Sequence, residues 1–138
     1  MFESHWQYDK AKEYLQKAPV ITTEIGNRKE EASCYGILGN VFVSLGQYER
    51  AIEYLEKALF IRTVFGDKKG EAADLANLGV VSRNVGDYEA SEVYLEKALS
   101  ISRDIGDRRR AFQILLKYAI LYLFQKKIRL PFVSSSVH

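Results

Sequence analysis

Apolar residues recur every three or four positions through most of the chain, which is the spacing of one buried face on an α-helix. The spacing is clear in two successive runs, Leu38–Leu45 and Ala51–Leu59. A glycine followed by a polar residue ends each run, as at Gly46-Gln47 and Gly66-Asp67. Glycine readily takes the left-handed backbone that ends a helix, and Asp or Asn caps the next helix. The pattern therefore predicts an all-α chain of short antiparallel helices.

The residues that mark the helix ends repeat with a period of 40 residues. Two series carry this period: Tyr8, Tyr48 and Tyr88, and Gly26, Gly66 and Gly106. Residues 26–65 match residues 66–105 at 17 of 40 positions, which is too dense for a chance similarity. We therefore predict a solenoid over residues 1–125, with a half-unit at 8–25, units at 26–65 and 66–105, and a degenerate last helix at 106–125. A basic, disordered tail is expected at 126–138.

The expected boundaries within a unit follow from the same residues. We expect Asn27, Asp67 and Asp107 to cap the first helix of each pair, and Tyr48 and Tyr88 to open the second. In the half-unit at 8–25, Pro19 replaces the Leu of the sister units, so we expect a kink or an early helix end near residue 18.

Two stretches, LGNVFVSLGQYERAIEYLEKAL and LGVVSRNVGDYEASEVYLEKAL, resemble the tetratricopeptide repeat. The signature positions in the first are Leu38-Gly39, Gly46, Tyr48, Ala51 and Ala58, and in the second Leu78-Gly79, Gly86, Tyr88, Ser91 and Ala98. The common unit has about 34 residues. The longer unit found in this chain is similar to the repeats of the LGN/Pins G-protein-signalling modulators, tetratricopeptide-repeat protein 28 and kinesin light chain. The resemblance implies helix-turn-helix repeats stacked in a right-handed solenoid.

The resemblance also implies a concave groove that is lined by the first helix of each pair and binds a partner peptide. Helical spacing assigns to this groove Asn40, Ser44, Asn77, Val80, Arg83, Asn84 and Lys117. The asparagines can donate to and accept from a peptide backbone, and the two cations can hold an acidic side chain. The small residues Gly36, Ala73 and Ala76 are expected to leave room for the ligand. The alternative interpretation is that these are ordinary solvated residues.

The function expected on this basis is that of a protein-interaction module or scaffold, in signalling or cytoskeletal assembly as the resemblance implies. A receptor for chaperone tails is disfavoured, because Ser33, Ile37, Ala73 and Asn77 do not supply the basic members of the carboxylate clamp that some relatives use.

Catalytic chemistry has little support in the sequence. The only histidines are His5 and His138, and the single cysteine, Cys34, has no histidine near it in the sequence. No phosphate-binding glycine loop or metal-ligand spacing is found. We therefore expect no enzyme, no cofactor and no metal. The start MFESHWQYDK is not typical of a signal peptide, so we expect a cytoplasmic protein.

Charge divides the chain unequally. Residues 1–107 carry 13 Lys or Arg and 18 Asp or Glu, whereas residues 108–138 carry seven basic residues and no acidic one. We interpret the basic part as a helix end with a solvated tail, and expect no nucleic-acid partner. The apolar run Ala111–Phe124 is shorter than the roughly 20 residues of a membrane span. We expect it to pack on the helix that begins at Tyr88 and to leave an exposed apolar face.

Both ends of the repeat pattern are incomplete, and this leaves two further alternatives open. The chain could be part of a longer array or a truncated product, with terminal helices that drive self-association. The basic and apolar segment at 108–130 could instead attach to a membrane surface.

Overall fold

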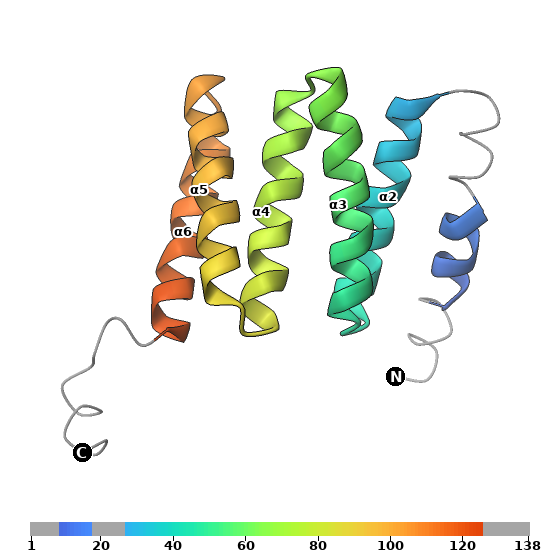
Figure 1. Cartoon of the computed structure of the whole chain (residues 1–138), viewed down its shortest axis with the longest axis horizontal. Coiled ribbons are helices and arrows are strands. Elements are labelled where there is room, and N and C mark those ends of the chain that lie inside the picture. Colours follow the sequence, from blue (N-terminus) through green and yellow to red (C-terminus); the bar gives the residue numbers. More distant parts are fainter. Residues whose placement is uncertain (1–8, 18–26, 126–138) are drawn as a thin grey trace, which may run out of the picture.

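A computed structural model describes residues 9–17 and 27–125 of the chain. It contains α2 (Arg28–Ser44), α3 (Tyr48–Phe65), α4 (Lys68–Asn84), α5 (Tyr88–Asp104) and α6 (Arg108–Phe124). Residues 9–17 form a further short helical segment, and these ranges contain no strand. Figure 1 shows the helices in chain order from one end of the molecule to the other, each running opposite to the next. The all-α solenoid is thus confirmed, whereas the predicted kink at Pro19 and the tail lie outside the described residues.

The helices begin and end at the glycine and polar residues that the sequence predicted for these places. The backbone of Gly66 has a φ of 70°, the left-handed conformation that closes α3. The side chains of Asn27, Asp67 and Asp107 each accept a hydrogen bond from a backbone N–H in the first turn of the following helix. These bonds satisfy donors that have no partner inside the helix. The predicted caps are confirmed, and Tyr48 and Tyr88 open α3 and α5 as expected.

Two glycines set the distance between the helices of a pair. A β-carbon at Gly39 would lie 2.6 Å from Cγ of Leu55, and one at Gly79 would lie 2.8 Å from Cγ of Leu95. Neither leucine could keep its place against a larger residue. The signature glycines are therefore required by close packing within each pair.

The core continues from one pair to the next. One buried cluster joins α2, α3 and α4 through Leu38, Phe42, Ala51, Leu55, Leu78 and Val81. A second joins α4, α5 and α6 through Leu75, Ala76, Leu95, Ala98, Ile114 and Leu121. Because α4 contributes to both clusters, each pair is stabilised by its neighbour as well as by its own partner helix.

The first helices of the pairs make up one layer. Among the labelled helices, α4 contacts both α2 and α6, whereas the backbones of α3 and α5 do not approach each other as closely. The stack therefore bends with α2, α4 and α6 on its inner side. This layer is where the predicted groove residues are carried.

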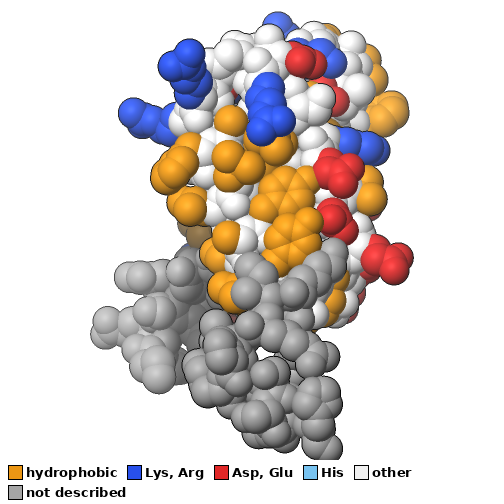
Figure 2. All heavy atoms as spheres, turned by 90° about the vertical axis from the view of Figure 1, so that its left-hand side faces the viewer, with side chains coloured by type: hydrophobic (Ala, Val, Ile, Leu, Met, Phe, Trp, Pro, Cys, Tyr) orange, Lys and Arg blue, Asp and Glu red, His pale blue; other side chains and the backbone are white. Residues whose placement is uncertain are grey.

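The last helix packs on α5 as predicted. The ring of Phe124 meets that of Tyr88 edge-on, with centroids 6.5 Å apart. The opposite face of α6 is open: Phe112 is 62% exposed and Leu116 is 50% exposed. Figure 2 shows apolar side chains gathered on this end of the molecule, with basic side chains above them and acidic ones to the right. No helix in the described part of the chain is both long and apolar enough to cross a membrane.

Candidate functional site

A hollow of about 350 Å³ lies on the inner layer between α2, α4 and α6. It is lined by Asn40, Val43, Asn77, Val80, Val81, Arg83, Lys117 and Ile120. Five of the seven predicted groove residues are therefore brought together in one place.

The repeat period explains why these side chains meet. Asn40, Val80 and Ile120 occupy the same position in three successive first helices, one period of 40 apart. Asn77 and Lys117 form a second such row, next to the first. Because equivalent helices stack in one layer, equal register on each helix becomes a row of side chains across the layer.

Two predicted residues lie outside this hollow. Ser44 and Asn84 are the last residues of α2 and α4, and both are exposed at the end of the layer. The side-chain oxygen of Asn84 accepts a hydrogen bond of 3.5 Å from Arg83. Neither residue lines the hollow, but Asn84 contacts Arg83, which does.

The expectation about small residues needs correction. Ala76 is 2% exposed and belongs to the second core cluster, so it makes no room for a ligand. Gly36 is half-buried, and its α-carbon faces the Arg62 and Asp74 side chains. The apolar residues that line the hollow include Val43, which the prediction omitted. Val43 lies one helical turn from Asn40, and that spacing could have identified it.

The hollow is positively charged. The Arg83 guanidinium lies 4.8 Å from the centroid of the Phe124 ring, and burial lowers its pKa. Burial also lowers the pKa of Lys117, and the charges of Arg110 and Arg83 lower it further. Within the described residues neither Arg83 nor Lys117 has a carboxylate at ion-pair distance. Two cations with apolar neighbours and no anion between them favour a ligand that carries negative charge.

A second polar cluster joins α3 to α4, and the sequence did not indicate it. Nε of Arg62 lies 2.8 Å from Oδ2 of Asp74, and its Nη1 lies 3.2 Å from Oδ2 of Asp67. Burial raises the pKa of Asp74 to about 6, although the charge of Arg62 opposes the shift. Cys34 and Ile114 occupy the equivalent positions of the neighbouring first helices, so the repeat contains no signal for this pair.

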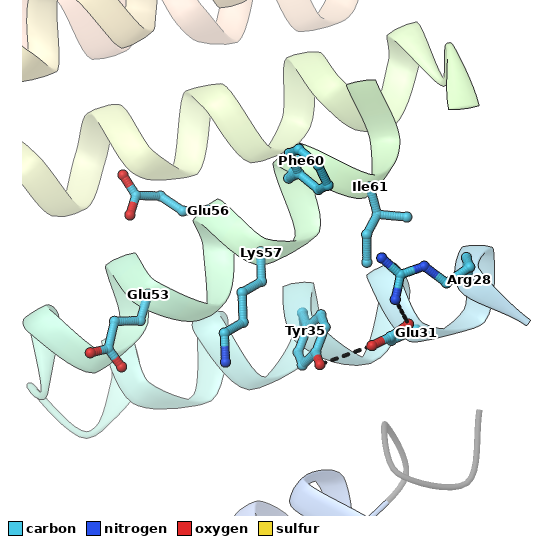
Figure 3. Close-up of a pocket in the computed structure, with 8 residues that line it drawn as sticks. All are labelled: Arg28, Glu31, Tyr35, Glu53, Glu56, Lys57, Phe60 and Ile61. Atoms are coloured by element: carbon cyan, nitrogen blue, oxygen red, sulfur yellow. Dashed lines mark hydrogen bonds and ion pairs between the residues drawn. The ribbon is translucent and has the colours of Figure 1, made fainter. Parts of the chain in front are cut away.

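A larger open pocket, of about 480 Å³, lies between α2 and α3. Figure 3 shows Glu31 between Arg28 and Tyr35, which lie 2.7 Å and 3.0 Å from its two carboxylate oxygens. Glu31 is buried, although glutamates are mostly surface residues in folded proteins. Nζ of Lys57 lies 5.5 Å from the centroid of the Tyr35 ring. Glu31, the buried charge of this pocket, therefore already has two partners within the chain.

The described residues offer little to a metal ion. No three His, Cys, Asp or Glu side chains within them come together at a distance suited to one. Cys34 is half-buried, and burial raises the pKa of its thiol. A raised pKa keeps the thiol protonated, which is the unreactive form.

Solved structures with similar folds come from several organisms. BtubC (BKLC) from P. vanneervenii is 24% identical with a TM-score of 0.76, and the match covers 87% of this chain and 50% of that one. A Signal Transduction ATPase with Numerous Domains (STAND) protein with a tetratricopeptide repeat sensor, from Pyrococcus horikoshii, is 25% identical with a TM-score of 0.76, covering 84% and 18%. The Podosopora anserina "kinesin light chain nearly identical TPR-like repeats" are 16% identical with a TM-score of 0.72, covering 91% and 63%. The chain therefore spans half or less of the first two proteins.

Sequence comparisons assign the repeats directly. No curated protein matches the chain. Models of the tetratricopeptide repeat match residues 7–63 and residues 75–105, which together are more than half of the chain. These two ranges contain both signature stretches and the half-unit before them. The chain belongs to the tetratricopeptide repeat family.

Proposed function

We propose that the inner layer binds an extended, acidic peptide segment of a partner protein, and that the chain works as a protein-interaction module. Tetratricopeptide repeats generally mediate protein–protein interactions, and the family supplies that general role. The finer proposal rests on one observation. Side chains from α2, α4 and α6 meet in a hollow that carries two cations without an acidic partner among the described residues.

The polar, apolar and charged residues of the hollow each match a chemical group of an extended acidic peptide. Asn40 and Asn77 come from adjacent helices, and each can pair with both the N–H and the C=O of a peptide unit. Val80 and Ile120 offer an apolar contact for one side chain of the peptide. Arg83 and Lys117 are half-buried, so a carboxylate that reached them would lie in a less screened environment than open solvent.

The electrostatics of the hollow favour an acidic ligand over a neutral one. The pKa of Lys117 is lowered partly because Arg83 and Arg110 repel its charge. A bound carboxylate would relieve this repulsion as well as form its own contacts. Binding should therefore weaken as salt rises and as the acidic side chains of the ligand are removed.

The experiment begins with peptides selected by display on the full chain. The affinity of a selected peptide is then measured by fluorescence anisotropy against Asn77→Ala combined with Arg83→Glu. We expect an affinity loss of about tenfold or more, because the charge of a half-buried contact is reversed. The matched control combines Gln47→Ala with Lys97→Glu, which likewise removes one side-chain amide and reverses one positive charge, at exposed positions outside the hollow.

Two results would remove the proposal. One is a set of selected peptides without acidic residues. The other is equal binding of the groove variant and the control variant. If both variants lose affinity equally, the charge of the whole chain, and not this hollow, attracts the ligand.

A further inference from the structure

The described helices contain half of a pair at each end of the row. Residues 9–17 occupy the register of a second helix, with Ala11 and Leu15 at the positions of Ser91 and Leu95 in α5. In α5 these two positions are 0% and 1% exposed, because α4 covers them. In residues 9–17 both are only half-buried. This segment therefore has the contact face of a second helix without the full cover that a first helix gives.

At the other end, α6 is a first helix whose contact face is open. Phe112 and Leu115 occupy the positions of Ala72 and Leu75 in α4. In α4 these positions are 1% and 3% exposed, whereas in α6 they are 62% and 47% exposed. The stack itself shows what kind of element covers such a face, because α3 covers α2 and α5 covers α4 in the same way.

We propose that residues 9–17 of a second copy cover the open face of α6, so that the chain associates head to tail. The segment and α6 are complementary halves of one repeat in the same sequence. The junction would continue the packing already seen between α4 and α5, moved on by one period. This self-association is independent of the peptide groove and goes beyond it.

The repeat geometry predicts which residues make contact at the junction between the two copies. The hydroxyl of Tyr94 on α5 donates a hydrogen bond of 3.3 Å to the carboxylate of Glu56 on α3. One period further, Tyr14 of the second copy takes the place of Tyr94, and Glu96 takes the place of Glu56. Tyr14 is 63% exposed and Glu96 is exposed, so both are accessible in the single chain.

One residue makes the junction looser than a complete pair. Ala119 stands where Gly39 and Gly79 admit a leucine of the opposite helix. A β-carbon at Gly79 would lie 2.8 Å from Leu95, so the methyl group of Ala119 must hold Leu15 of the second copy further away. We therefore expect reversible association, which Ala119→Gly should tighten.

Two different surfaces meet at this junction, so a dimer would still have one free end of each kind. Such contacts lead to open chains of copies and not to a closed pair. The average mass of the full chain should thus rise steadily with concentration, without a plateau at the dimer.

The test is light scattering of the full chain over a range of concentrations, with two single-end blocks. Leu115→Glu places a charge on the face of α6, and Tyr14→Glu places a carboxylate opposite Glu96. Each block alone should weaken association about tenfold or more, because a charge enters the contact without a partner. A mixture of the two variants should form a one-to-one complex that does not grow, since it joins their two intact ends. Ala119→Gly should shift association to lower concentration.

Other occupants of α6 give different results. A wild-type chain that stays monomeric at all concentrations overturns the proposal, whether its own residues 126–138 or another protein cover the face. If Leu115→Glu abolishes association and Tyr14→Glu leaves it unchanged, two α6 faces pair with each other, and the head-to-tail arrangement is wrong. Both native side chains are exposed in the single chain, Tyr14 by 63% and Leu115 by 47%, and circular dichroism of each variant checks that it is folded. Tyr14→Phe, which keeps the ring and removes only the hydroxyl, should weaken association less than Tyr14→Glu.

Discussion

Arg62 and Asp74 form an ion pair across the boundary between two helix pairs, with Nε of Arg62 2.8 Å from Oδ2 of Asp74. The Asp74 side chain is only 5% exposed. Removal from water disfavours the charged carboxylate more than the guanidinium favours it, and the pKa of Asp74 rises to about 6. The pair thus connects α3 to α4 at a cost that depends on pH.

This gives a direction for the pH dependence of stability. Asp74 has an ordinary pKa of 3.8 when unfolded and a pKa of about 6 when folded, so the folded chain binds the proton more tightly. Its contribution to stability is fully present below pH 3.8 and is lost as the pH rises through 6. We expect a loss on the order of 2 to 3 kcal/mol, which Asp74→Asn should remove. Urea unfolding of both chains across this range measures it, and parallel curves would contradict it.

A matched pair of glycine substitutions tests the packing within the helix pairs. Gly79→Ala should destabilise the fold by about 1 to 2 kcal/mol, because its methyl group collides with Leu95 and outweighs the better helix propensity of alanine. At Gly36 a β-carbon would come no closer than 3.6 Å to the Arg62 side chain. Gly36→Ala should therefore stabilise the fold by up to about 1 kcal/mol. Thermal unfolding measures both changes, and shifts of the same sign would be evidence against this packing argument.

Helix caps offer a second comparison. Asp87 accepts a hydrogen bond of 3.1 Å from the backbone N–H of Ala90, whereas Gln47 makes no such bond at the same position of the previous unit. Asp87→Ala should cost about 1 kcal/mol of unfolding free energy, and Gln47→Ala only a few tenths. Denaturant midpoints with equal slopes would measure this difference. An equal cost for the two changes would show that the cap bond at Asp87 is not a stabilising one.

The titration of Lys117 tests the charge of the hollow without any ligand. Its pKa is lowered by burial first, and then by the charges of Arg110 and Arg83. Arg110→Gln should raise the pKa of Lys117, and Arg83→Gln should raise it by a smaller amount. NMR titration with isotopically labelled lysine follows the group directly. Lys97→Gln, a change of the same charge at an exposed site on α5, should leave it unmoved. A pKa that responds alike to all three changes would mean that the cations of the hollow do not interact specifically.

Much of the lining of the hollow could be predicted because it is periodic. Asn40 and Val80 lie in equivalent places on neighbouring helices, and their register alone put both on the inner layer. Ser44 was assigned by the same spacing, but it lies at the end of α2, where the layer ends too. Ala76 was misassigned, because its helix is covered on two sides and a small residue there fills the core. Spacing within one helix does not show how many neighbours the helix has.

The sequence by itself determined the all-α fold, the period, the helix ends and the position of the first helices, because these depend on local backbone chemistry and on repeated apolar spacing. Only the tertiary structure showed that Asp74 is buried against Arg62 and which face of α6 is open. These relationships join residues of different repeats. They depend on how the helices stack. The stacking is decided by the residue types at positions that do not repeat, so the 40-residue period carries no information about these relationships.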